Sequence, residues 1–438
     1  MFAFHEAFAD IVALFQHFTL PEALRHQIAA TGGDLEKQNL LGQLAVQFGE
    51  ATGRYGALRD YIGRVVKAKE KLPENEENNN ADGDGTADQS GGHGGKHPAT
   101  AEREIWVRRK GERTDYEKAT EAHDRGAVLV AAVFDAFLQI YKLRTADLLR
   151  LATGGIGILP DGAISADLVN RLAREASKVA GHVLNMCIRA LDYCPPVDLT
   201  YGEYLRALIT ADADLVADDK YGYRTAFIQA FRERGIYPRD VKHLSPGSLV
   251  WEPPPLPLRQ AKVKAIVDQL TLNWGMNLDR KTAYKSSQSN AKNFWKWLMD
   301  EDAVSDEEIE TLGLIRIHEP RPDNIGGQAG ELRRIEVHSV RSARRVGPDG
   351  NIRSDLVVEI TQTFRPADGG RFRGGCTLLI DLATGEVRYM VRKKVNSAER
   401  LAAQSSFGVD ATDQLRDNYF DDPRGPREPF ALVHRVHG

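Results

Sequence analysis

Cysteine is scarce in this chain: its 438 residues include only Cys187, Cys194 and Cys376. Three thiols cannot form a disulfide framework, and their spacing does not match that of a structural zinc site. Such scarcity is typical of a reducing compartment, and we expect a cytoplasmic protein. Cys187 and Cys194 lie near the expected end of a helix, where buried, unreactive thiols are commoner than nucleophiles.

Neither sign of charge dominates the sequence, which has 58 Lys and Arg against 62 Asp and Glu and a net charge of -4. Because a dedicated nucleic-acid-binding protein is usually basic, this balance disfavours nucleic acid as a partner. The longest apolar run, residues 126–141, is short for a membrane span and contains Asp135, so we expect no transmembrane helix and no membrane partner. Residues 1–18 carry Glu6 and Asp10 without a basic stretch, unlike a signal peptide.

Residues 73–98 lack apolar side chains almost entirely. They contain six Gly and six acids but only two apolar residues, so they cannot offset the entropy of ordering. The sequence predicts a disordered acidic insertion here, with helical patterns on both sides. His93 and His97 lie within it, but a Gly-rich segment would not hold them on one helix face, and we do not expect a metal site there.

Apolar residues recur at helical spacing through the first half of the chain. Residues 126–143 are apolar nearly all round, which is typical of a helix at the centre of a helical domain. We therefore predict one mainly helical domain over residues 1–237. Its helices are expected near residues 4–15, 126–143, 161–193, 201–213 and 221–234.

The pattern changes after residue 237. A Pro-rich connector is expected over 238–258, an accessory α+β domain over 259–400, and a polar tail over 401–438. The accessory domain should contain helices at 259–270 and 289–301, then an antiparallel β-meander, because the period falls to two and turn signals separate the runs. The predicted fold class is therefore α+β. Its strands are expected near Val337 and in residues 356–364, 376–382 and 387–395.

Glu6 and Asp10 are four residues apart on the first expected helix, so both carboxylates lie on one face. One interpretation needs no special function: the two carboxylates are solvated and stabilise the helix through their attraction to the positive end of its dipole. His5 and Glu6 open the zinc-binding pattern H-E-x-x-H, but residue 9 is Ala, so this helix is not a two-histidine zinc helix.

The first half of the chain nevertheless resembles the thermolysin-like zinc metallopeptidases (gluzincins), over about residues 4–237. The segment His5-Glu6-Ala7-Phe8-Ala9-Asp10-Ile11, followed by an apolar helix, is similar to the helix that carries their third zinc ligand, with His5 where the best-known members have Asn. His123-Asp124-Arg125-Gly126 precedes a buried helix, as does the family's active-site histidine. The segments 200–215 and 226–236 are similar to the two helices that end the family's catalytic domain.

This resemblance implies a role for each matching residue. Glu6 would ligate zinc, Asp10 would orient a zinc-bound histidine, and His123 would stabilise the oxyanion of the tetrahedral intermediate. The family's Asp partner of that histidine is not at its usual place, and Glu121 or Glu117 would have to substitute for it. The substrate would be a peptide or protein, and the three site residues should converge on one concave surface.

The family's H-E-x-x-H motif occurs nowhere among the 12 His of this chain. Zinc hydrolysis needs three protein ligands and a general base, so we expect this chain alone to be inactive and to hold zinc poorly. The chain is then a C-terminal portion of a longer peptidase, whose upstream segment carries the motif, or a degenerate relative. In the first case Phe4, Phe8 and residues 127–137 should expose an apolar patch.

A non-catalytic helical interaction module with a partner-binding β domain is the alternative class. Residues 315–400 contain 16 Lys and Arg against 11 Asp and Glu, so a patch for nucleic acid or a membrane surface is conceivable there. Alternation of charged and apolar residues on an exposed sheet face would give the same composition, and we favour that interpretation. We also expect His182 to be a hydrogen-bonded core residue, and Trp295 and Trp297 to pack in a core.

Overall fold

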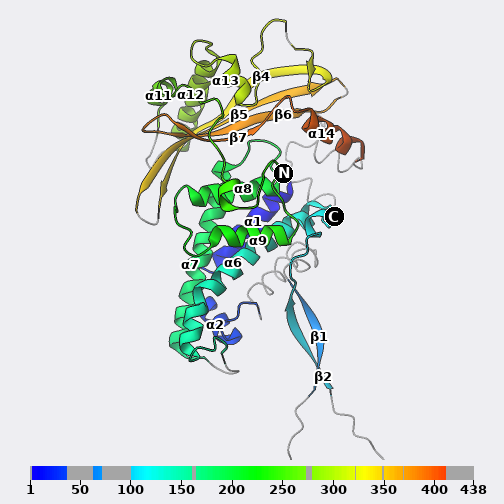
Figure 1. The fold of residues 1–438 in the computed structure, drawn as a ribbon, viewed down its shortest axis with the longest axis vertical. Coiled ribbons are helices and arrows are strands. Elements are labelled where there is room, and N and C mark those ends of the chain that lie inside the picture. The colour runs from blue at the N-terminus through cyan, green and yellow to red at the C-terminus, as the bar shows by residue number, and fades with distance from the viewer. Residues whose placement is uncertain are drawn as a thin grey trace, which may run out of the picture.

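The computed structural model describes residues 2–36, 63–71, 100–159, 164–272, 279–320, 322–347, 350–367 and 369–410. The predicted disordered insertion 73–98 lies outside the described residues, as does the tail from residue 411. The fold is α+β, with a helical half and an antiparallel sheet, as the sequence predicts (Figure 1).

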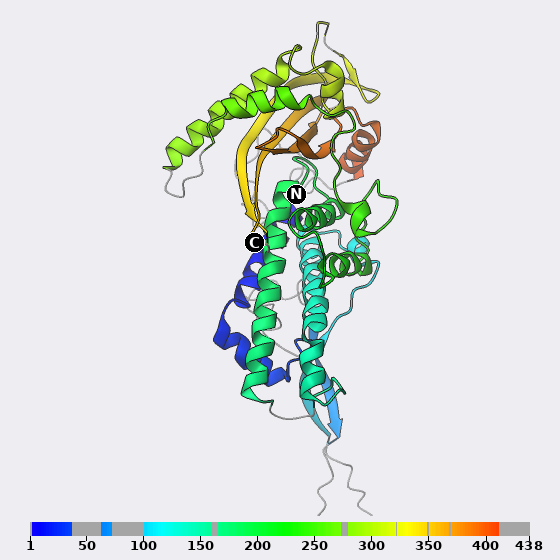
Figure 2. The same ribbon diagram turned by 60° about the vertical axis from the view of Figure 1, so that its left-hand side comes forward.

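The helical half is built around α6 (Ala122–Ala152). Its most apolar residues, 127–138, are buried, as expected for a helix that is apolar all round. The helices around it are α1 (Phe2–His17), α2 (Pro21–Thr31), the short α5 (Asp115–Lys118), α7 (Ala166–Ala190), α8 (Tyr201–Ala213) and α9 (Tyr223–Glu233). Figure 2 shows α6 and α7 running side by side through the length of this half.

α6 has the length and composition of a helix that could cross a membrane, which corrects the expectation that this run is too short. However, 83% of its most apolar window is buried inside the protein. That is the environment of a core helix, and length with hydropathy alone is weak support for a membrane span.

A two-stranded antiparallel sheet flanks the acidic insertion, within the region that was predicted to be mainly helical. β1 (Gly63–Lys71) pairs with β2 (Thr100–Arg108), with Gly63 opposite Arg108 and Lys71 opposite Thr100. Neither segment was among the predicted helices, and the strand pair was not predicted, although the β-branched and aromatic residues of β2 favour a strand. The pair extends away from the helical body (Figure 1).

The second half contains the predicted meander. Strands β3 (Asn324–Ile325), β4 (Gln328–Val346), β5 (Ile352–Pro366), β6 (Phe372–Asp381) and β7 (Val387–Lys393) pair in sequence order, all antiparallel. Its helices are α11 (Gln260–Gln269), α12 (Arg280–Met299), α13 (Asp306–Thr311) and α14 (Ala398–Asp410). The short α10 (Pro246–Leu249) lies in the connector and packs against α8 and α9 of the helical half.

The long sheet is covered on both faces, because alternate residues of a strand point to opposite sides. Val358, Ile360 and Leu378 pack in one cluster with Val263 of α11 and Phe294 of α12. On the other face, Val357 and Leu379 belong to the core of the helical half. The connector 238–258 therefore does not separate two independent cores.

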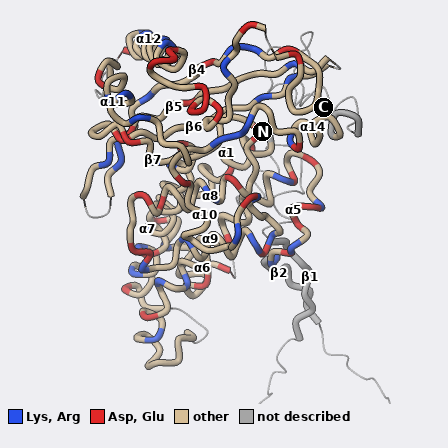
Figure 3. The backbone as a smooth tube through the Cα atoms, turned by 45° about the horizontal axis from the view of Figure 1, so that its top comes forward, with Lys and Arg blue, Asp and Glu red and all other residues tan. Residues whose placement is uncertain are grey.

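Buried ion pairs also join the sheet to the helical half. Asp192 lies 2.7 Å from Arg345, and Asp214 binds Arg388. Asp355 links the two arginines, at 2.6 Å from Arg345 and 2.7 Å from Arg388. Burial by itself raises the pKa of Asp214, but hydrogen bonds from Arg388 and Tyr193 outweigh it, so this pKa is lowered. Charges of both signs are interspersed over the rest of both halves (Figure 3).

The predicted polar tail begins as a helix rather than as irregular chain. α14 includes residues 401–410, and its Leu401 is buried against Phe364, Phe372 and Val395. No helix was predicted here from the sequence; among the side chains described for residues 401–406, only Leu401 is buried.

Candidate functional site

The candidate site lies where the start of α1 packs against the first turns of α6. Gly126 makes this approach possible: a Cβ placed there would lie 3.2 Å from the carbonyl oxygen of Ala3 and 3.6 Å from the Cβ of Glu6. Further along, Phe15 of α1 and Phe18, just after its end, pack on Phe137, with ring centroids 5.5 and 4.7 Å from it. The two helices therefore run parallel, and both begin at the candidate site.

This packing places Glu6 beside His123. The Oε2 of Glu6 is 4.0 Å from the Nδ1 of His123, and their side chains are 29% and 24% exposed. The separation permits an ion pair when His123 is protonated but is too long for a hydrogen bond. Both groups are partly exposed to solvent, which is a requirement for contact with a substrate or a metal ion.

Asp10 lies one helical turn after Glu6, on the same side of α1. Burial, and then the negative charge of Glu6, raise the pKa of Asp10 to about 6. A carboxyl group with a raised pKa is a frequent property of functional sites, although buried structural carboxyl groups show it too. The structure thus brings together all three residues that the resemblance singles out.

The prediction of an exposed apolar patch beside the site is wrong. Phe4 is only 9% exposed, Phe8 is partly buried, and residues 127–137 are at most 4% exposed. Phe4 packs edge-on against Tyr204 of α8, with ring centroids 4.8 Å apart. The apolar side of α1 and α6 is thus covered within the chain itself.

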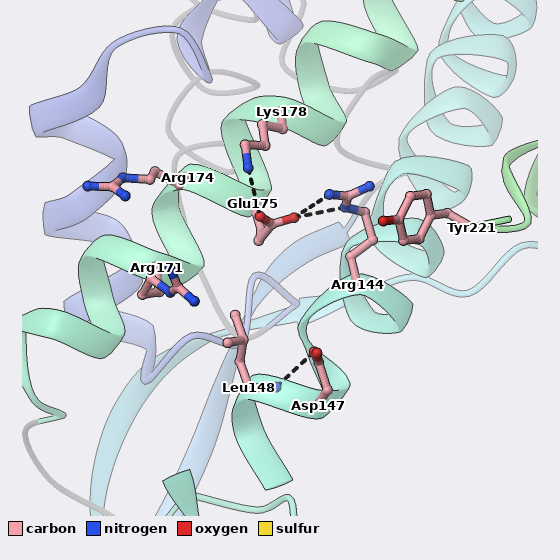
Figure 4. A pocket seen from close by; sticks show the side chains of 8 residues that line it. All are labelled: Arg144, Asp147, Leu148, Arg171, Arg174, Glu175, Lys178 and Tyr221. Carbon is pink, nitrogen blue, oxygen red and sulfur yellow. Dashed lines mark hydrogen bonds and ion pairs between the residues drawn. The ribbon is translucent and has the colours of Figure 1, made fainter. Parts of the chain in front are cut away.

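A hollow of about 350 Å³ lies elsewhere, between α6 and α7 (Figure 4). Glu175 stands at its centre, 2.6 Å from Arg144 and 3.1 Å from Lys178, while Tyr221 stacks on Arg144. Arg144 follows His123 by 21 residues of the same helix, which is about 30 Å at 1.5 Å per residue. The hollow is therefore remote from Glu6 and does not contribute to the candidate site.

The other candidates of the sequence have structural explanations. His182 lies 3.2 Å from the buried Asp212, whose second oxygen is 2.8 Å from Arg224. Burial raises the pKa of the Cys187 thiol to about 12 and also raises the pKa of Cys194, so both thiols are unreactive as expected.

Trp297 packs against a core as predicted, with its ring centroid 5.0 Å from that of Phe294. Trp295 is half-buried and donates a hydrogen bond to the Ile335 carbonyl.

Among the described residues, no group of three or more His, Cys, Asp or Glu side chains is arranged to hold a metal ion. Sequence reasoning identified Glu6, Asp10 and His123 but did not identify Gly126 as the residue that lets the two helices approach. A glycine inside an apolar helical run was the available signal, since it indicates a close backbone contact.

Comparison of the chain with protein-family models, with curated proteins and with solved structures finds no match.

Proposed function

We propose that residues 2–237 are the C-terminal lobe of a thermolysin-like zinc metallopeptidase, which hydrolyses peptide bonds once a second segment supplies the H-E-x-x-H helix. The distance of 4.0 Å between Glu6 and His123 is the observation that carries this proposal. The two residues occupy the positions of a zinc ligand and an oxyanion stabiliser in the resemblance, and both must reach the same substrate carbonyl.

The described residues alone do not fit a zinc site. Glu6 supplies one carboxylate, whereas catalytic zinc takes three protein ligands and an open position. We therefore assign chemistry only to the side chains that are here. His123, half-buried at the start of α6, would donate a hydrogen bond to the developing oxyanion. Glu6 would supply negative charge to a cation beside it, and Asp10 would orient a histidine of the missing helix.

The genomic DNA upstream of the Met1 codon provides the experiment. It should encode, in frame, an H-E-x-x-H motif about twenty or more residues before Glu6. A chain extended to include that motif should hydrolyse an unstructured protein such as casein, and His123→Ala should slow it by about a hundredfold, the usual effect of losing one oxyanion donor. Stop codons, or an open frame without the motif, would reject the proposal.

The burial of the site's apolar flank favours a second candidate function. A lobe that has lost a neighbouring helix should expose apolar surface, yet Phe4 and residues 127–137 are covered. A non-catalytic helical module with a partner-binding β domain would show this complete packing. In that case the extended chain would have no peptidase activity, and Glu6→Gln would leave all its binding properties unchanged.

A further inference from the structure

Five arginines line a hollow of about 560 Å³ at one end of the long sheet. One glutamate and one threonine complete its described wall, and no residue of that described wall is apolar or aromatic. We call it the arginine hollow; its residues are Arg333, Arg334, Glu336, Thr363, Arg365, Arg371 and Arg373.

The register of the sheet explains why these residues meet. Thr363 of β5 is paired with Arg373 of β6, and Arg365 lies two residues beyond Thr363 on the same face. On the neighbouring strand β4, an irregularity between Leu332 and Ile335 places Arg333 and Arg334 together as exposed residues.

The residues between them point to the opposite face. Leu332, Phe364 and Phe372 are buried there, against Leu401 of α14. One face of this sheet end is therefore core, and the other carries the arginines.

Several charges of the hollow are poorly compensated. Among the described lining residues, five guanidinium groups accompany one carboxylate, Glu336, which lies 3.8 Å from His338. Of the five, Arg371 has an interaction with another group. Arg333 lies 3.1 Å from Glu331, but both side chains are about half exposed, where such a pair contributes little. Within the part of the chain that the structure describes, the side chains of Arg334, Arg365 and Arg373 form no ion pair or hydrogen bond. Like charges held this close repel each other, and a bound anion would relieve that repulsion.

We propose that the arginine hollow binds a ligand with two or more adjacent phosphate groups. Guanidinium groups form paired hydrogen bonds to phosphate oxygens, and several of them can share a chain of phosphates. Among the described lining residues there is no aromatic ring to stack on a nucleobase and no apolar side chain to hold a peptide, so phosphate groups suit this lining best. The volume suits a small ligand or a short stretch of a longer one.

Adjacent phosphate groups could come from a free polyphosphate or from the backbone of a single-stranded nucleic acid. The full chain should therefore be titrated at 50 mM salt with inorganic tripolyphosphate and, separately, with a labelled oligodeoxythymidylate. At least one of the two titrations should show saturable binding. If three arginines neutralise phosphates of the oligonucleotide, the slope of log K against log salt should be about -2, since each contact contributes about -0.7 for a single strand. A free polyphosphate as the source would show tight tripolyphosphate binding and weaker oligonucleotide binding.

Variants separate the hollow from general electrostatics. Arg365→Gln combined with Arg373→Gln should weaken binding at least about tenfold, because two charged hydrogen-bond partners are lost, and should reduce the oligonucleotide slope to about -0.7. Arg280→Gln, at an exposed arginine at the start of α12, removes one positive charge away from the hollow and should change binding less than twofold. Arg365→Gln alone is the charge-matched comparison and should weaken binding more than Arg280→Gln does. Glu336→Gln should tighten binding.

Three outcomes would overturn the proposal. The first is no binding of either phosphate ligand, and the second is equal weakening by the Arg280 variant. The third is tighter binding of poly-glutamate than of both phosphate ligands, which would indicate an acidic protein partner. Circular dichroism must show native folding of each variant, which is expected because Arg365 and Arg373 are exposed.

Discussion

Glu6 at the start of α1 and His123 at the start of α6 lie 4.0 Å apart, although α2, β1, β2 and α5 lie between them in the chain. Their contact follows from the parallel packing of two apolar helices at Gly126. If Glu6 were only a solvated helix carboxylate and His123 only a loop residue, nothing would require the two side chains to lie close together. The relationship is what the metallopeptidase interpretation requires of its two key side chains.

Gly126 should be needed for this approach. Gly126→Ala brings a methyl group to 3.2 Å from the Ala3 oxygen, so crowding should cancel the gain of about 1 kcal/mol that alanine gives over glycine within a helix. Gly181→Ala in α7 is the matched control, because nothing lies within 4 Å of the added methyl group. Urea unfolding should show the control to be more stable than the Gly126 variant by about 1 kcal/mol or more. Equal stabilisation of both would show that α1 does not pack closely on α6.

Ionisation of Asp10 should cost stability. Its folded pKa of about 6 lies above its ordinary value of 3.8, so the folded state binds more protons between these values. Stability is therefore lost as the pH rises from about 4 to 6. Asp10→Asn should raise the free energy of unfolding by about 2 kcal/mol at pH 7.5, after allowance for partial exposure, and by almost nothing at pH 4. Glu22→Gln, at an exposed position of α2, should change the free energy of unfolding by the same small amount at both pH values. A gain that is the same at both pH values would contradict the raised pKa.

The buried ion pairs between the halves should be strongly coupled. Arg388→Ala leaves Asp214 and Asp355 without a shared cation, which should destabilise the protein by about 3–5 kcal/mol. Arg353→Ala is the control, since Arg353 is 49% exposed and 4.0 Å from Asp214, and it should cost less than about 1 kcal/mol. Chemical denaturation followed by both tryptophan fluorescence and far-ultraviolet circular dichroism measures the two costs. A similar small loss for both variants would show that the halves are not joined through this network.

Helix α8 and the meander could be predicted from sequence because local patterns determine them. Residues 201–213 form a helix as predicted, and Thr200 and Glu203 close its capping box. The period of two and the turn signals were enough for β5, β6 and β7. Burial of both sheet faces could not be predicted, because it depends on Val357 and Leu379 meeting helices from the distant half of the chain.

The two sites differ in how far the sequence could reveal them. Glu6, Asp10 and His123 were found through motifs, each readable in one short segment. The arginine hollow could not be found in this way, because the pairing of Thr363 with Arg373 is a matter of strand register. The sequence also could not distinguish an apolar flank covered by Tyr204 from one left open.

Zinc content of the extended chain tests the central claim most directly. The protein should be expressed with the in-frame codons upstream of Met1, dialysed, and analysed for metal by mass spectrometry, beside Glu6→Gln and the exposed control Glu22→Gln. The account predicts one zinc per chain in the extended protein and in the Glu22 variant, with loss of zinc in the Glu6 variant. The chain of 438 residues on its own should retain little zinc. Full zinc content in the Glu6 variant, or one tightly held zinc in the unextended chain, would contradict the assignment of Glu6 as the third ligand of a shared metallopeptidase site.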